Sequence, residues 1–284
     1  MKKSFGLSLL LIICCFFIWL FWPFFPEKLS EIITARPNVI NLKERKVFAP
    51  PPLKVIEEIK NNQTVLYQEK IIELTNRERK SRGLPDLLEN LKLNQAAGAK
   101  LDDMLAYQYF EHQSPSGKEV DGLAADFSYQ FIAIGENLAM GNFENEEKLI
   151  EGWMNSPGHR ENILNSIYQE IGVAVKKGEF EGKTLWLAVQ HFGLPITACP
   201  GPDESLNILI KQKQEELEQL ENELFDLRIE LQKIKPKWSP AYHNKTEEYN
   251  KLVEQYNNLL AEYKKLVDQY NHQVEEFNKC LETR

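Results

Sequence analysis

Two histidines and one glutamate of this sequence stand in loop-like contexts that suit chemistry. His112 lies in YFEHQSPSG, Glu136 in IGENLAMG and His159 in SPGHRENIL. Each motif contains the small or turn-forming residues that are common in loops around functional clefts. Two imidazoles and a carboxylate suit a divalent metal such as zinc, with an open position for an activated water. We therefore take these three residues as the candidate site, and Glu136 as the candidate catalytic residue.

A purely structural interpretation of the same residues stays open. Two imidazoles and a carboxylate also form buried hydrogen-bond networks that only fix loops. Glu136 can be a third metal ligand or a general base, but not readily both. The charge of Arg160 should disfavour protonation of the neighbouring His159 and keep its ring neutral. A Ser-His-Glu hydrolase that uses Ser114 or Ser116 is a weaker alternative, because the sequence has no nucleophile-elbow motif.

The helices and strands that must position these residues are visible as patterns in the sequence. They predict an α+β domain over residues 64–196. Apolar residues at helical spacing indicate helices in VLYQEKIIELTNRERKSRGL, LKLNQAAGAKLDDMLAYQYFEH and NEEKLIEGWM. The third helix should end at a Ser-Pro-Gly turn, after which the chain returns to the core. EIGVAVKKG and KTLWLAVQHFG predict an antiparallel β-hairpin. Because side chains alternate along a strand, only one of Gln190 and His191 can face a cleft.

In their order along the chain, these motifs resemble the signatures of the CAP superfamily. This SCP-like family is named after cysteine-rich secretory proteins, antigen 5 and pathogenesis-related proteins, and the resemblance is to its bacterial branch. The motifs are LTNRERKSRGLPDL, AAGAKLDDMLAYQYFEHQSPSG, IGENLAMG, WMNSPGHRENIL, IGVAV and WLAVQHFG. The resemblance covers residues 66–194 and implies an α-β-α sandwich with a central cleft.

The resemblance also implies which residues line the cleft. His112, Glu136 and His159 match family positions where two histidines and acidic residues hold a divalent metal, often zinc, so the two histidines are the expected metal ligands. Gln190 is favoured over its neighbour as the cleft residue of the last strand. Many eukaryotic members carry a second glutamate after the tryptophan helix, where this chain has Asn155 and Ser156. The ligand set therefore departs from the family pattern.

Outside this domain, residues 1–26 predict a membrane anchor. Two lysines precede an uncharged, mainly apolar run that is long enough to cross a bilayer, which takes about 20 residues. No small-residue cleavage site follows it, which favours an uncleaved anchor over a removed signal peptide. We expect a single-pass protein of the cell membrane with the rest of the chain outside. Residues 27–63, with the triple proline Pro50–Pro52, predict an extended and solvated stalk.

Residues 203–284 predict an antiparallel coiled-coil hairpin. Leucines at steps of three and four mark the first arm, and KPKWSPAY separates it from the second. The second arm has an aromatic residue every seven positions and a leucine three positions later. The aromatic residues are Tyr249, Tyr256, Tyr263, Tyr270 and Phe277, and the leucines are Leu252, Leu259 and Leu266.

Two cysteines flank this hairpin symmetrically. Cys199 lies 40 residues before Ser239, and Cys280 lies 40 residues after Pro240, in the break between the arms. Folding the chain at the break brings both cysteines to the base of the hairpin, and disulfides persist outside the cytoplasm. We predict a Cys199–Cys280 disulfide; two free thiols are the alternative.

Composition and architecture together narrow the function. The formal net charge of −8 argues against a nucleic-acid-binding protein. We expect a non-catalytic envelope module whose cleft binds a ligand or partner, such as an envelope protein, a peptide or a lipid. The hairpin could be a docking surface, a spacer or a site of self-association. The alternative is a metal-dependent hydrolase that acts on peptides or cell-wall material.

Overall fold

The computed structural model describes residues 46–55 and 64–283. The predicted anchor over residues 1–26 lies outside the described residues. Within the described part of the chain, no helix is both long enough and apolar enough to span a membrane. These residues form two compact units, one of residues 46–55, 64–201 and 277–283, and the other of residues 202–276.

The first unit is built on a six-stranded sheet. The strand order is β1-β4-β6-β5-β3, and β2 also pairs with β4. The strands are β1 Lys46–Phe48, β2 Leu53–Val55, β3 Leu88–Glu89, β4 Phe131–Gly141, β5 Glu170–Phe180 and β6 Lys183–Pro195. The central pairs β4–β6 and β5–β6 are antiparallel, whereas β1 and β2 run parallel to β4. All residues of β4 are buried, because strands pair with both of its edges and helices cover both faces of the sheet.

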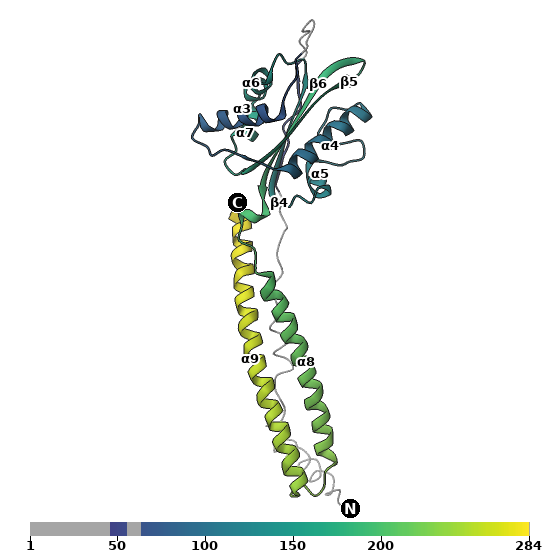
Figure 1. The fold of residues 1–284 in the computed structure, drawn as a ribbon, viewed down its shortest axis with the longest axis vertical. Helices are drawn as coiled ribbons and strands as arrows, with labels where there is room; N and C mark the ends of the chain where they lie inside the picture. Colours follow the sequence, from purple (N-terminus) through teal and green to yellow (C-terminus); the bar gives the residue numbers. More distant parts are fainter. Residues whose placement is uncertain (1–45, 56–63, 284) are drawn as a thin grey trace, which may run out of the picture. The chain divides into compact units, whose positions relative to one another are not determined.

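Helices cover both faces of this sheet (Figure 1). One face carries α4 and α5, and the other carries α3, α6 and α7. Their bounds are α3 Gln68–Lys80, α4 Leu91–Tyr107, α5 Val120–Asp126, α6 Glu146–Asn155 and α7 Pro157–Leu164. The predicted mixed fold of helices and a sheet is confirmed. The predicted hairpin is formed by β5 and β6, and its turn lies at Glu181 and Gly182, both with positive φ.

Two local predictions around the site need correction. The segment FIAIGENLAMG forms β4, although only a two-stranded hairpin was expected. Its nearly continuous apolar run is typical of a strand buried on both faces, and Glu136 with Asn137 interrupts that run. SPGHRENIL does not return directly to the core after a turn. Instead Pro157 occupies the first position of α7, where a missing N–H costs nothing.

The stalk prediction for residues 27–63 is wrong where the structure describes this segment. Lys46–Phe48 pairs with Ala133–Gly135, and Leu53–Val55 pairs with Ala139–Gly141. Residues 46–55 are therefore part of the sheet rather than a solvated spacer. The short strands flanking a proline run escape pattern recognition because each has only three residues.

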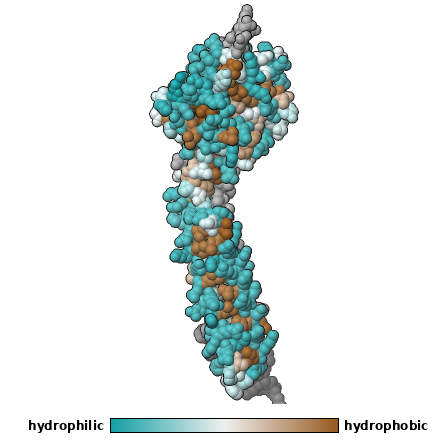
Figure 2. Space-filling view, in the orientation of Figure 1, coloured by the Kyte–Doolittle hydropathy of each residue, from teal (hydrophilic) through white to brown (hydrophobic). Residues whose placement is uncertain are grey.

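The second unit is an antiparallel helical hairpin of α8 Glu204–Lys233 and residues from α9 Pro240–Thr283. Ion pairs join residues that lie at matching distances from the tip: Lys213 Nζ is 3.8 Å from Glu262 Oε2, and Lys245 Nζ is 2.9 Å from Glu230 Oε2. The predicted break lies between the two helices. Supercoiling stays a prediction. The face in view is mainly hydrophilic, with hydrophobic side chains interspersed (Figure 2).

The buried seam of the hairpin follows the predicted aromatic residues. The five aromatic residues at seven-residue spacing are buried. The second set of buried positions in α9 lies four residues after the tyrosines, at Leu260, Val267 and Val274. The leucines predicted for this role, three residues after the tyrosines, are only partly buried. In α8 the buried residues Ile210, Leu217 and Leu224 recur every seven positions.

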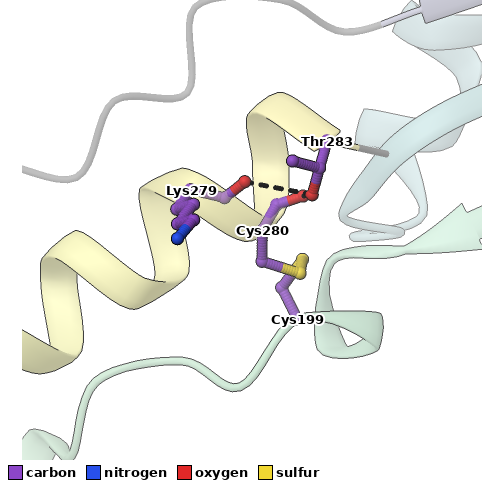
Figure 3. Close-up of a disulfide and its surroundings, with 4 residues drawn as sticks. All are labelled: Cys199, Lys279, Cys280 and Thr283. Carbon is purple, nitrogen blue, oxygen red and sulfur yellow. Dashed lines mark hydrogen bonds between the residues drawn. A yellow bond between two sulfur atoms is a disulfide. The ribbon is translucent and has the colours of Figure 1, made fainter.

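The predicted disulfide is formed. Cys199 and Cys280 are joined, with their Cα atoms 5.8 Å apart (Figure 3). Cys199 follows the short 3-10 helix Ile196–Ala198 after β6, and Cys280 lies near the end of α9. Both cysteines belong to the first unit. The bond therefore ties the last residues of the chain covalently to the end of the sheet.

Candidate functional site

Glu136 lies in the middle of β4 between two histidines. Its Oε1 is 2.6 Å from Nδ1 of His112, and its Oε2 is 2.9 Å from Nε2 of His191. The carboxylate and the His191 ring are fully buried, and His112 is mostly buried. His112 belongs to the loop after α4, whereas His191 lies directly opposite Glu136 in the β4–β6 pairing. Residues distant in sequence thus form a His–Glu–His network.

Both ring nitrogens of His112 face hydrogen-bond acceptors. Nδ1 contacts the carboxylate of Glu136, and Nε2 contacts the backbone carbonyl oxygen of Pro50. Neither oxygen can donate a hydrogen bond while the carboxylate is ionised, so in this arrangement both nitrogens donate and the ring is an imidazolium. His112 therefore has no nitrogen lone pair available for a metal.

The electrostatics of the pair agree with this protonation. Burial alone would lower the pKa of His112, but the hydrogen bond and charge of Glu136, helped by the Pro50 carbonyl, raise it overall. Burial alone would raise the pKa of Glu136, but hydrogen bonds from His112 and His191 hold it well below its usual value. The two groups thus stabilise each other's charged forms.

Lys100 is a further member of the site that was not predicted. This α4 side chain is buried, and its ammonium group donates to the carbonyl of His112 at 2.5 Å and to the Tyr109 hydroxyl at 3.2 Å. Burial lowers its pKa, while the nearby Glu136 and other carboxylates oppose this change. A sequence signal existed, because Lys100 lies at helical spacing between the apolar Ala97 and Met104.

Gln190 does not join the His–Glu–His network. It lies opposite Asn137 in the β4–β6 pairing, and residues directly opposite each other project to the same face of a sheet. Its amide nitrogen donates to Thr75 Oγ1 at 2.8 Å, and its oxygen accepts from Asn137 at 3.2 Å. The prediction that Gln190, rather than His191, shares the cleft with Glu136 is therefore wrong. Gln190 belongs to a buried amide network on the other face.

His159 is buried on α7 beside this amide network. Its backbone carbonyl accepts from Asn137, and its Nδ1 is 2.7 Å from Ser156 Oγ. Nε2 has no hydrogen-bond partner among the described residues. Burial, followed by the charge of His112, lowers the pKa of His159 to about 4, although the Leu138 carbonyl opposes the change. The ring is therefore neutral near pH 7, as predicted. The lowered pKa results from burial and the charge of His112, however, and not from Arg160 as expected.

Protonation of His159 should destabilise the protein as the pH falls. The unfolded chain binds a proton near pH 6.5, whereas the folded chain does so only near pH 4. Stability is therefore lost between these values as the pH falls, by about 3.5 kcal/mol at about 1.4 kcal/mol per pKa unit. Urea unfolding at several pH values should show this slope, and His159→Gln should remove it. An unchanged slope in the variant would contradict the assignment.

Of the two predicted metal ligands, His159 keeps an unpaired Nε2, but His112 has no free nitrogen to offer a metal in this arrangement. His112 has both nitrogens engaged by oxygen acceptors, and Glu136 has both oxygens engaged by imidazoles. Across the described residues, no three histidine, cysteine or acidic side chains are grouped so that they could hold a metal ion. The serine hydrolase alternative also lacks its geometry, because Ser114 Oγ and Ser116 Oγ bond to each other at 2.8 Å and His112 is already engaged.

Comparisons with known proteins agree with the order of motifs. Residues 72–192 match the model of the CAP family, described as the cysteine-rich secretory protein family. The uncharacterised protein YkwD of Bacillus subtilis (strain 168) is 39% identical over 120 residues, which are 42% of this chain and 45% of YkwD. The uncharacterised membrane protein YlbC of the same organism is 33% identical over 110 residues, 39% of this chain and 32% of YlbC.

One solved structure is similar over a comparable part of the chain. It is an extracellular protein containing a SCP domain from Bacillus anthracis str. Ames, with 28% identity and a TM-score of 0.38. The match covers 44% of this chain and 39% of that chain. This chain therefore spans less than half the length of the curated relatives and of this solved protein.

Proposed function

Because residues 72–192 belong to the CAP family of cysteine-rich secretory proteins, we propose that this chain is an extracytoplasmic binding module rather than a hydrolase. The observation that carries the proposal is that the side chains of Glu136 and His112 use all their polar atoms within the network. A general base needs a free acceptor, and a catalytic metal needs at least three donors with an open position. Glu136 and His112 meet neither requirement, since each polar atom of both side chains is already paired.

The location outside the cytoplasm has support of its own. A disulfide between Cys199 and Cys280 is typical of oxidising compartments. The hydrophobic N-terminal sequence of residues 1–26 suits an anchor, and the relative YlbC is named a membrane protein. We propose a single-pass anchor that holds the CAP domain at the outer side of the cell membrane, where its cleft meets a protein, peptide or lipid partner of the envelope.

A metal analysis separates this proposal from the metal-dependent hydrolase. Full-length protein purified in mild detergent without chelators should contain far less than one equivalent of zinc, and added zinc should leave its melting temperature unchanged. A metal that bound the native state would raise the melting temperature by mass action. The proposal fails if zinc raises it in the unaltered chain and in the control His272→Ala, an exposed histidine, but not in His112→Ala.

A further inference from the structure

Residues 46–55, which we call the strap, lie along the edge of β4 at the site. The family match begins only at residue 72, so the strap is additional to the matched domain. Its first three residues pair with β4 before Glu136, and its last three pair with β4 from Ala139 onward. Without the strap, this side of β4 would be an unpaired sheet edge, which is a template for another extended segment.

The strap is not paired with β4 where it passes the His–Glu–His network. Four strap residues, Ala49 to Pro52, stand opposite the three β4 residues Glu136 to Leu138. Three of the four are prolines, which have no N–H to donate to a neighbouring strand. The carbonyl of Pro50 instead accepts a hydrogen bond from His112. The site thus binds this segment through a backbone carbonyl oxygen, which proline has like any other residue.

The surroundings of the strap are shaped for close contact with it. A Cβ atom at Gly158, next to His159, would lie 2.6 Å from Cβ of Pro50, and one at Gly141 would lie 2.5 Å from the Val55 carbonyl oxygen. Asn162 donates to the Phe48 carbonyl at 3.2 Å, and the Phe48 ring packs edge-on against Tyr168. The glycines leave room for the strap backbone, and Asn162 supplies a fixed hydrogen-bond donor to it. Together they form a groove that fits an extended backbone.

The strap is nevertheless weakly held for a sheet element. None of its ten residues is buried, although β4 beneath it is buried throughout. A segment with six paired residues and side chains that are exposed or only half-buried should open locally at a lower free energy cost than the β4–β6 pair.

We propose that this groove is a binding site for extended, proline-containing peptides, and that the strap is a built-in ligand occupying it. The inference rests on the proposed binding function and names its ligand class. A partner segment would bind as a parallel strand on β4, with its prolines over Glu136 and a carbonyl on His112, a form of β-strand addition. Because the strap is tethered, its effective concentration is in the millimolar range, so it blocks weak competitors.

A peptide added in trans tests the groove. The probe is a fluorescent peptide with the sequence of residues 46–55, and the host is the full chain carrying Phe48→Ala and Leu53→Ala to weaken the strap. Anisotropy should show binding at least tenfold tighter than to the unaltered chain, because the tethered competitor is weakened. Adding Gly158→Val to the host should abolish binding, and a peptide with alanine in place of the three prolines should bind at least tenfold more weakly.

The opposite results would overturn the inference. These are no binding to a folded host, binding that survives Gly158→Val, or equal binding of the alanine peptide. Should the host not fold, hydrogen exchange on the unaltered chain decides: strap amides should exchange at least a hundredfold faster than amides shared by β4 and β6, and exchange at one common rate would refute the proposal. If the peptide does not bind and the protein contains no zinc, only the peptide proposal fails and the proposed binding function stands. If the protein contains stoichiometric zinc, the proposed function itself fails.

Discussion

Replacing Cys199 and Cys280 together with serine should lower the free energy of unfolding of the helical hairpin by about 4 kcal/mol. The disulfide closes a loop of 81 residues in sequence separation, and a cross-link of that span removes a large amount of chain entropy from the unfolded state. The loop contains the whole hairpin. Hydrogen exchange of amides in residues 240–276 should therefore accelerate by about three orders of magnitude, at 1.4 kcal/mol per tenfold change.

The control for this prediction is the unaltered chain treated with a reductant. Reduction should reproduce the exchange rates of the double serine variant, because both break the same cross-link. Amides in the β5–β6 pair should change much less, since those strands are held by an extensive antiparallel ladder. Equal hairpin exchange in the oxidised and reduced chains would show that the bond contributes nothing to stability.

Substituting Glu136 with glutamine should destabilise the unit that contains the sheet by about 3 kcal/mol near pH 5.5. The substitution keeps the shape but removes the charge that pairs with His112, and breaking a buried ion pair on one side costs about 3 to 5 kcal/mol. The lowered pKa of Glu136 gives stability that is lost as the pH falls below about 4.5. The raised pKa of His112 gives stability that is lost as the pH rises above about 6.5.

The difference between the unaltered chain and Glu136→Gln should thus be greatest between about pH 4.5 and 6.5. Melting temperatures measured from pH 3 to 9 give this profile. Glu146→Gln is the matched control, because Glu146 is also buried but accepts a hydrogen bond from the Tyr67 backbone N–H instead of an imidazole. A difference that is independent of pH for Glu136→Gln would contradict the assigned ion pair.

The parts of the fold that follow a local repeat were predictable. A seven-residue aromatic period placed one side of the hairpin seam correctly, and symmetry around the break predicted the disulfide. The second position of the seam was placed one residue early, at Leu259 instead of Leu260. Both residues are leucine, so hydrophobicity alone does not distinguish them, and the choice depends on how the partner helix packs.

The site was only partly predictable, because it depends on strand register. The motifs identified Glu136 and His112, which do meet, and left open the structural network that is observed. They did not show that His191, rather than Gln190, lies opposite Glu136. Alternation reveals that neighbours face opposite ways, but long-range pairing decides which neighbour meets a given residue. The strap was missed for the same reason, since Pro50 and His112 are 62 residues apart.

The most direct test of the closed network is a nitrogen-15 spectrum of the histidine rings near pH 7, recorded with and without zinc. The account predicts that His112, whose signals are those lost in His112→Ala, has both ring nitrogens protonated, whereas the histidine of an added model peptide is mostly neutral. Zinc should not move either signal. An unprotonated Nε2 on His112 that shifts when zinc is added would contradict the closed network and restore the metal-dependent hydrolase.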